Sequence, residues 1–248
     1  MRLRVLTYNI HRAIGLDRKF APDRIIEILR HHDADLVLLQ EVDCGAPRSR
    51  LLNLAAWLAR HLGYDHHALG LNVYMKTGRY GNATLSRYPI SRQRNIDLTI
   101  GRAKPRGAQH TRIELAEHGA RLRLDVFNVH LSLTARLRRQ QMTRLLAAED
   151  LRRLSPRDPC LVAGDMNDWR GKLGPHFFAP AGFSCATTRR LGVRRPIRTY
   201  PSFAPTGGLD RIFFRGPLRL LHVLRSRLPV ARLASDHLPV LAEFELGE

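Results

Sequence analysis

The chain has 248 residues, of which 44% are hydrophobic, so it is long enough to bury a substantial core. Its longest apolar runs, such as residues 36–39, have the length of strands, which excludes an ordinary transmembrane helix. Three cysteines lie far apart without a Cys-x-x-Cys pair, so the sequence suggests neither a zinc site nor a disulfide framework. No apolar signal segment stands near the first residue, so we expect a cytoplasmic protein, and we favour a monomer.

The formal net charge of +19 favours a polyanionic partner, with nucleic acid as the leading candidate and an anionic lipid surface as the alternative. Only four of the 41 basic residues are lysine. Such an arginine bias also follows from GC-rich codon usage, and most of the arginines are scattered along the chain. A merely solvated basic surface is therefore an equally weighted interpretation of the charge.

Apolar runs and alternating patterns predict more strands than helices. In chain order, the strands are predicted at Leu3–Asn9, Asp35–Val42, Ala83–Ile90, Thr111–Leu115, Leu122–Leu131, Cys160–Ala163, Leu209–Phe214, Leu218–Leu224 and Leu238–Leu246. Helices are predicted from Pro22 onward, over Leu51–Leu62 and over Ala135–Leu154. No repeat or linker interrupts them, so we expect one α/β domain over residues 1–248 with β-sheets packed face to face.

A row of polar residues stands at the ends of the predicted strands. Rigid strands that end in polar residues are suited to carry chemistry, because the site does not disturb the core. Taken singly, each residue has a plainer explanation, such as a turn cap, a solvated carboxylate or a buried, hydrogen-bonded histidine. Only the joint pattern indicates a site, and its members are Asn9, Glu41, His130, Asp165, Asn167, Asp210, Asp236 and His237.

Seven short fragments carry a resemblance to a known family. They are Thr7–His11, Leu39–Val42, Gly81–Arg87, Asn128–Leu131, Gly164–Asp168, Leu209–Ile212 and Ser235–Val240. In this order they resemble the endonuclease/exonuclease/phosphatase superfamily, which includes DNase I-like nucleases, abasic-site endonucleases, inositol polyphosphate 5-phosphatases and neutral sphingomyelinases. The form of Gly164–Arg170 is similar to that of a bacterial branch whose members are often found near cardiolipin-synthase-type proteins.

The resemblance implies a four-layer α/β sandwich, in which two packed, mostly antiparallel β-sheets are flanked by helices. The catalytic residues would then lie at one end of the sandwich. The resemblance further implies a divalent-metal-dependent hydrolase of phosphodiester or phosphomonoester bonds that uses Mg²⁺ or Mn²⁺.

Five of the polar residues would then serve metal, water and phosphate. Glu41 would be a direct metal ligand, since hard cations prefer carboxylate oxygen. Asn9 would hold metal, water or a phosphate oxygen, and Asp236 would bind or position metal near the leaving group. Asp165 would deprotonate the attacking water, and Asn167 would bind this water or a phosphate oxygen.

The remaining three would stabilise the phosphoryl group. His237 would donate to the phosphate oxyanion, while Asp210 accepts from the other imidazole nitrogen and favours the protonated ring. His130 would add a second donor to the phosphate.

Further residues have weaker assignments. Arg211, Arg106 and Arg170 are candidates for phosphate contacts, although surface or structural ion pairs are at least as expected for each. Asn82 and Tyr200 are expected to support the site rather than take part in the reaction. Tyr200 would stack on a base only if it were not a packed aromatic side chain.

The substrate is left open among three readings of the chain. A nuclease is the first, because basic charge and phosphodiester chemistry agree. A lipid or small-molecule phosphoesterase is the alternative, since one fold serves many substrates. An inactive scaffold is a remote third, and the presence of Asp165, Asp210 and His237 argues against it.

Overall fold

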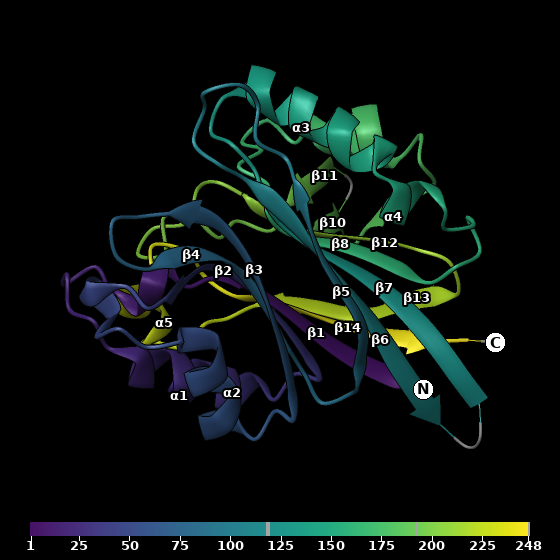
Figure 1. Cartoon of the computed structure of the whole chain (residues 1–248). Helices are drawn as coiled ribbons and strands as arrows, with labels where there is room; N and C mark the ends of the chain where they lie inside the picture. Colours follow the sequence, from purple (N-terminus) through teal and green to yellow (C-terminus); the bar gives the residue numbers. More distant parts are fainter. Residues whose placement is uncertain (118–119, 192, 248) are drawn as a thin grey trace.

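Two six-stranded β-sheets form the centre of the computed structural model, which describes residues 1–117, 120–191 and 193–247 (Figure 1). The first sheet has the order β13 (Leu218–Arg225), β14 (Val240–Leu246), β1 (Arg2–Asn9), β2 (Leu36–Cys44), β4 (Arg79–Ser86) and β3 (His66–Tyr74). The second has the order β5 (Ile90–Asp97), β6 (Gly107–Glu117), β7 (Ala120–His130), β8 (Cys160–Asp165), β12 (Asp210–Arg215) and β9 (Ser184–Cys185). A separate small hairpin pairs β10 (Thr188–Leu191) with β11 (Val193–Pro196).

The two sheets pack face to face, and helices cover both outer faces (Figure 1). One apolar cluster, which includes Val5, Leu38 and Val126, fills the space between the sheets. A second lies between the first sheet and the helices α1 (Pro22–His32) and α2 (Leu54–Leu62). A third lies under α3 (Ala135–Ala147) on the outer face of the second sheet. The predicted four-layer sandwich is therefore confirmed.

The helices begin and end where local chemistry allows. Pro22 occupies the first turn of α1, where its missing N–H costs nothing. The side chain of Asn53 caps α2 by accepting from the amide of Ala56 at 3.2 Å. Gly63 ends α2 with a left-handed φ of 71°. No helix in the described ranges is both long and apolar enough to cross a membrane.

The predicted helix over Ala135–Leu154 is wrong in one respect, because it breaks at Ala148. Ala148 is extended, and the short α4 (Glu149–Arg152) follows it. No glycine or proline marks the break. The carboxylate of Asp150 instead reaches the sheet, where it pairs with Arg92 at 2.8 Å and Arg94 at 3.2 Å. Tertiary ion pairs thus override the helical pattern of the sequence.

The prediction lacks the strands β3, β5, β9, β10 and β11, and one predicted strand is divided. The segment Ala83–Ile90 spans the end of β4 and the start of β5, with Pro89 in the turn between them. Strands β3 and β5 lie at sheet edges, and β5 carries mostly polar residues on a largely exposed surface. A strand without an apolar face gives little hydrophobic signal.

The strand directions bring the polar strand ends together. Neighbouring strands run antiparallel except for the pairs β1–β2 and β7–β8. Within each parallel pair, the carboxyl ends lie at the same edge, so Asn9 lies beside Gln40 and His130 beside Asp165. Strands β12 and β14 run antiparallel to their neighbours and begin at this edge. We call this edge of the sandwich the catalytic end.

A buried group of amides joins the two sheets just below the catalytic end. Asn128 of β7 donates to the carbonyl of Leu39 at 3.0 Å and to that of Ala83 at 2.9 Å. Its own side-chain oxygen accepts from Gln40 at 2.8 Å, and its carbonyl accepts from Asn82 at 2.9 Å. Leu39 and Ala83 form the last regular pair before a bulge in β2. The amide of one sheet thereby satisfies carbonyls of the other at this bulge.

Substitution Asn128→Leu should lower the free energy of unfolding by about 3 kcal/mol, because it leaves several buried polar groups without partners. Chemical denaturation of both proteins measures this difference. The exposed Asn95→Leu on β5 is the matched control, and its loss should stay below about 1 kcal/mol because water replaces the lost bonds. Equal losses in the two variants would contradict the assigned role of Asn128.

Candidate active site

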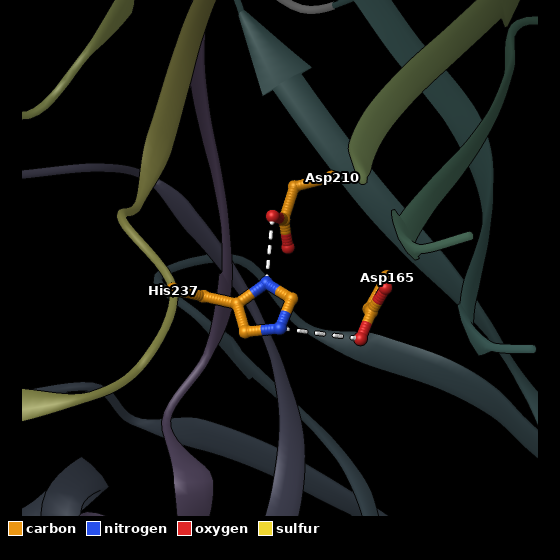
Figure 2. A group of neighbouring side chains, drawn as sticks. All are labelled: Asp165, Asp210 and His237. Carbon is orange, nitrogen blue, oxygen red and sulfur yellow. Dashed lines mark hydrogen bonds and ion pairs between the residues drawn. The ribbon is translucent and has the colours of Figure 1, made fainter. Parts of the chain in front are cut away.

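His237 lies between two buried carboxylates that come from the other sheet (Figure 2). Its Nδ1 is 2.9 Å from Oδ2 of Asp210, and its Nε2 is 3.7 Å from Oδ2 of Asp165. Asp165 and Asp210 face each other in the ladder between β8 and β12, which fixes their spacing. His237 approaches them from the segment that precedes β14, so this group spans both sheets.

Two hydroxyl groups hold this arrangement in place. Thr199 donates to Oδ2 of Asp210, the oxygen that also faces His237. Ser235 donates to the carbonyl of Asn9 at 2.7 Å and accepts from the amide of His237 at 3.2 Å. The positions of the imidazole and its carboxylate partner are therefore set by short, local contacts.

The electrostatics of the group favour a protonated imidazole. Burial disfavours the charged ring, but the negative charges of Asp210 and Asp165 outweigh it and raise the pKa of His237 to about 10. Burial also raises the pKa of the Asp165 carboxyl, although the positive charge of His237 opposes this shift. The site thus places a cationic donor beside a carboxylate that gains proton affinity.

Asp165 is the centre of a second set of contacts. Its Oδ2 accepts from Asn9 Nδ2 at 3.1 Å and lies 3.4 Å from His130 Nε2. Its Oδ1 accepts from the backbone amide of Asn167 at 3.0 Å. The side chain of Asn167 in turn donates to the carbonyl of Leu131 at 3.0 Å. These contacts orient the carboxylate from three directions.

Gly164 allows β7 and β8 to approach closely at this point. It has a φ of 140°, and a Cβ on it would lie 1.9 Å from the carbonyl oxygen of Val129. Val129 is its partner in the ladder, and the next pair joins His130 to Asp165. Only glycine fits such a backbone position, so the glycine of the Gly-Asp-x-Asn motif sets the distance between the two side chains.

Glu41 points into the same region because β2 is irregular there. The ladder between β2 and β4 shifts register between Leu39 and Val42, and Glu41 has a φ of 55°. The side chain of Glu41 is 14% exposed, and its Oε2 lies 3.5 Å from Nε of Arg12. This oxygen is buried without a hydrogen-bond donor. Such an orphaned, hard carboxylate oxygen fits a divalent metal ligand.

Several cations surround these carboxylates. Burial lowers the pKa of His130 well below its ordinary value, and the positive charges of Arg106, His237, Lys104 and Arg12 add to the effect. Arg106 is buried, and the carboxylates of Asp165 and Glu41 oppose the lowering of its own pKa by burial. A neutral His130 and a cluster of cationic side chains suit an anionic ligand.

Three further residues that the sequence predicted for the site or its support are Tyr200, Asn82 and Asp236. The ring of Tyr200 lies 5.0 Å from that of His237. Asn82 donates to the carbonyls of Gly107 and Asn128 and so belongs to the group of buried amides below the catalytic end. The negative charge of Asp236 also contributes to the raised pKa of His237.

The two other arginines that the sequence offered for phosphate contacts lie on β12 and on the loop after β8. Arg211 follows Asp210 on β12, so its side chain projects to the other face of the sheet and lies beside Gly171. Arg170 is exposed on the loop after β8. Phosphate contacts of either remain predictions.

The sequence did not single out several residues of this region. Arg12 lies in the one-turn 3₁₀ helix His11–Ala13, and Lys104 and Thr199 lie in loops. In neither setting does a period of the sequence predict which side chains turn inward. Arg106 was noted without preference among three arginines. Its place directly before Gly107, at the start of a strand that begins at the catalytic end, is the signal that could have selected it.

The spacing of Asp165, Asp210 and His237 is also that of a metal-binding group, since ligand atoms of the three lie within 4.8 Å of one another. The same three side chains therefore have two possible roles, as metal ligands or as an acid–imidazole–acid relay.

Fold and site together define the protein as a hydrolase of phosphoester bonds. The chain belongs to the endonuclease/exonuclease/phosphatase family, whose model matches residues 6–237. It is 36% identical to the uncharacterized protein YbhP of Escherichia coli (strain K12) over 254 residues, which cover 98% of this chain and 96% of that protein.

Solved structures show the same fold. The human Nocturnin catalytic domain with bound sulfate anion superposes with a TM-score of 0.77 and 21% identity, covering 99% of this chain and 95% of that chain. TDP2 of D. rerio complexed with single strand DNA product superposes with a TM-score of 0.72 and 17% identity, covering 98% and 99%.

The charge of His237 should stabilise the metal-free fold. Its folded pKa of about 10 exceeds the ordinary value of about 6.5, so this contribution is complete below about pH 6.5 and is lost as the pH rises through about 10. The free energy of unfolding in chelator should therefore fall, on the order of a few kcal/mol, between pH 7 and pH 10.

Denaturation at several pH values measures this fall. His237→Gln should remove most of it, whereas the exposed His222→Gln, the matched control, should keep the wild-type profile. An unchanged slope in His237→Gln would show that His237 is not the group responsible.

Proposed function

We propose that the protein is a divalent-metal-dependent phosphodiesterase in which Asp165 activates the attacking water. The observation that carries this proposal is the buried imidazole of His237 between Asp165 and Asp210, with the orphaned carboxylate of Glu41 in the same basic region. A phosphodiester is anionic and repels a hydroxide, so its hydrolysis needs positive charge at the phosphate and a base for water. The site has residues for both tasks.

We assign the metal, Mg²⁺ or Mn²⁺, to Glu41, with Asn9 and Asp236 as further ligands or positioning groups. When bound, the metal supplies a Lewis acid that polarises the phosphoryl oxygen. The group of Asp165, Asp210 and His237 is the weaker choice. A protonated His237 has no free lone pair, and its Nδ1 already donates to Asp210.

The other side chains then have distinct roles. Asp165 accepts the proton of water, and its raised pKa suits a general base near neutral pH. Asn167 binds this water or a phosphate oxygen. His237 donates Nε2–H to the phosphate oxyanion, while Asp210 holds the ring. His130 donates a second hydrogen bond to the phosphate as a neutral imidazole. Arg106 adds a fixed positive charge beside them.

Nucleic acid is the first substrate that the charge suggests, and the single-stranded DNA product bound to the structurally similar TDP2 is consistent with it. A lipid phosphoester is the second candidate, since it shares the same reacting group and a polyanionic surface. An inactive scaffold fits poorly with an intact acid, base and imidazole in one site. We further propose one domain over residues 1–248, a monomer and a cytoplasmic location.

Glu41→Ala should abolish metal-dependent hydrolysis of bis(p-nitrophenyl) phosphate without unfolding the protein, because it removes the main metal ligand. The loss should be about 10³-fold or more in turnover. Titration calorimetry with Mn²⁺ should show weaker metal binding in the same variant.

Glu27→Ala on α1 is the matched control and should retain wild-type turnover. Full activity of Glu41→Ala in the presence of Mg²⁺ would refute the assignment of this ligand.

Asp165→Asn and His237→Ala should each lower turnover of this soluble substrate by about 10²–10⁴-fold, since they remove the base and the oxyanion donor. Their melting temperatures identify any loss of fold. Near-normal rates in either variant would exclude that residue from the reaction.

A further inference from the structure

Exposed apolar side chains are concentrated at the catalytic end of the molecule. Among the side chains that the structure describes, the large hydrophobic residues with extensive exposure are Leu16, Leu51, Tyr74, Leu133, Trp169, Phe203 and Leu233. Their exposed fractions range from 39% to 72%. Each of them lies at a strand terminus of the catalytic end or in a segment attached there.

The strand connections establish these positions. Leu51 follows β2, the strand that contains Glu41, while Leu133 and Trp169 come shortly after His130 and Asp165, the last residues of β7 and β8. These three segments therefore lie at the same end of the sandwich as the proposed reaction centre.

The remaining exposed side chains complete this rim. The amide of Leu16, after β1, donates to the carbonyl of Leu233 at 2.9 Å, and Leu233 lies in α5 (Ala231–Ala234), shortly before His237. Figure 1 shows α5 at the end of the sheets opposite to the two labelled chain ends. Tyr74 ends β3, and Phe203 lies in the loop before β12.

Basic side chains accompany the apolar ones. Six of the seven have at least one exposed arginine or lysine within three positions, and one for each of these six is Arg18, Arg50, Lys76, Arg136, Arg170 and Arg232. A surface that combines exposed apolar side chains with cations is suited to bind a lipid layer, which has an apolar interior and can have anionic headgroups. We call these seven apolar residues and six basic residues the catalytic rim.

We infer that the catalytic rim docks on an anionic lipid surface, so that the substrate of the proposed site is a phosphodiester in a lipid headgroup. This inference rests on the proposed phosphodiesterase activity. Contact through the rim turns the catalytic end, and with it the basic region around Glu41 and Asp165, toward the headgroups. The same face then serves for docking and for entry of the substrate.

The identity of the exposed side chains favours lipid over nucleic acid. Four of the seven are leucines, which have no flat face on which a base can stack. Single-stranded nucleic acid is held chiefly by aromatic platforms and backbone cations. Leucine instead inserts between lipid chains, and aromatic residues such as Trp169 and Tyr74 prefer the headgroup level. An anionic lipid surface therefore accounts for both the leucine and the aromatic side chains of the rim.

Vesicle sedimentation tests the docking. The wild-type protein should bind vesicles of phosphatidylcholine mixed with phosphatidylglycerol at least about tenfold more tightly than vesicles of phosphatidylcholine alone. The double variant Leu51→Ser/Leu133→Ser should weaken this binding about tenfold or more. Both leucines are exposed, so the fold should persist, and the melting temperature checks this.

A charge pair provides the matched comparison. Arg50→Ser/Arg170→Ser in the rim should weaken vesicle binding, whereas Arg152→Ser/Arg157→Ser, two exposed arginines before β8 at the other end, should leave it unchanged. Equal effects of the two pairs, or equal binding to both vesicle types, would overturn the inference. Single-stranded oligonucleotide binding that depends on the leucines, without vesicle binding, would overturn it too.

Activity separates this inference from the proposed function. Leu51→Ser/Leu133→Ser should keep wild-type turnover of soluble bis(p-nitrophenyl) phosphate and lose most hydrolysis of vesicle phosphatidylglycerol, measured as released phosphoester product. Glu41→Ala should do the reverse, binding vesicles normally without hydrolysis. Unimpaired vesicle hydrolysis by the leucine variant would refute docking through the rim and leave the phosphodiesterase proposal standing.

Discussion

The buried amide of Asn128 is the contact on which the geometry of this protein depends. The residues of the candidate site come from both sheets, since Asn9 ends β1 and Glu41 lies at the bulge of β2 in one sheet, while Asp165 ends β8 in the other. Apolar packing between sheets is non-directional and would tolerate a small slip. The hydrogen bonds of Asn128 to Leu39 and Ala83 are directional and fix the sheets relative to each other beside the bulge of β2.

That fixed frame explains how opposite charges can be buried at close range. Asp210 and Asp165 stabilise His237 as a cation. Without this cation, burial of either carboxylate would cost more free energy. Around this group, Arg106 and Arg12 face carboxylates that they do not fully satisfy. The site is therefore organised before any ligand arrives, which lowers the reorganisation needed at the phosphate.

The sequence predicted those features whose signal is local. Apolar runs located β1, β2 and β8, and the fragments in or after these strands selected Glu41 and Asp165 as candidates, because such a fragment is defined by its own residues. The prediction failed where contacts between residues far apart in the sequence determine the structure. The break at Ala148 depends on ion pairs of Asp150 with β5, the position of Arg12 depends on the 3₁₀ turn after β1, and the exposure of Leu133 depends on the whole surface. Metal and substrate roles stay predictions, since geometry alone does not test them.

The close approach of two strands at Gly164 limits which residues the Gly-Asp-x-Asn motif can accept at this position. Because Gly164 has no side chain, its backbone can lie directly against that of Val129. Any Cβ at this position would collide with the carbonyl oxygen of Val129. Widening that gap would separate His130 from Asp165 by carrying one backbone away from the other, even if both side chains stayed intact. Sequence variation at position 164 is thus constrained by the separation of two backbones rather than by chemistry of its own.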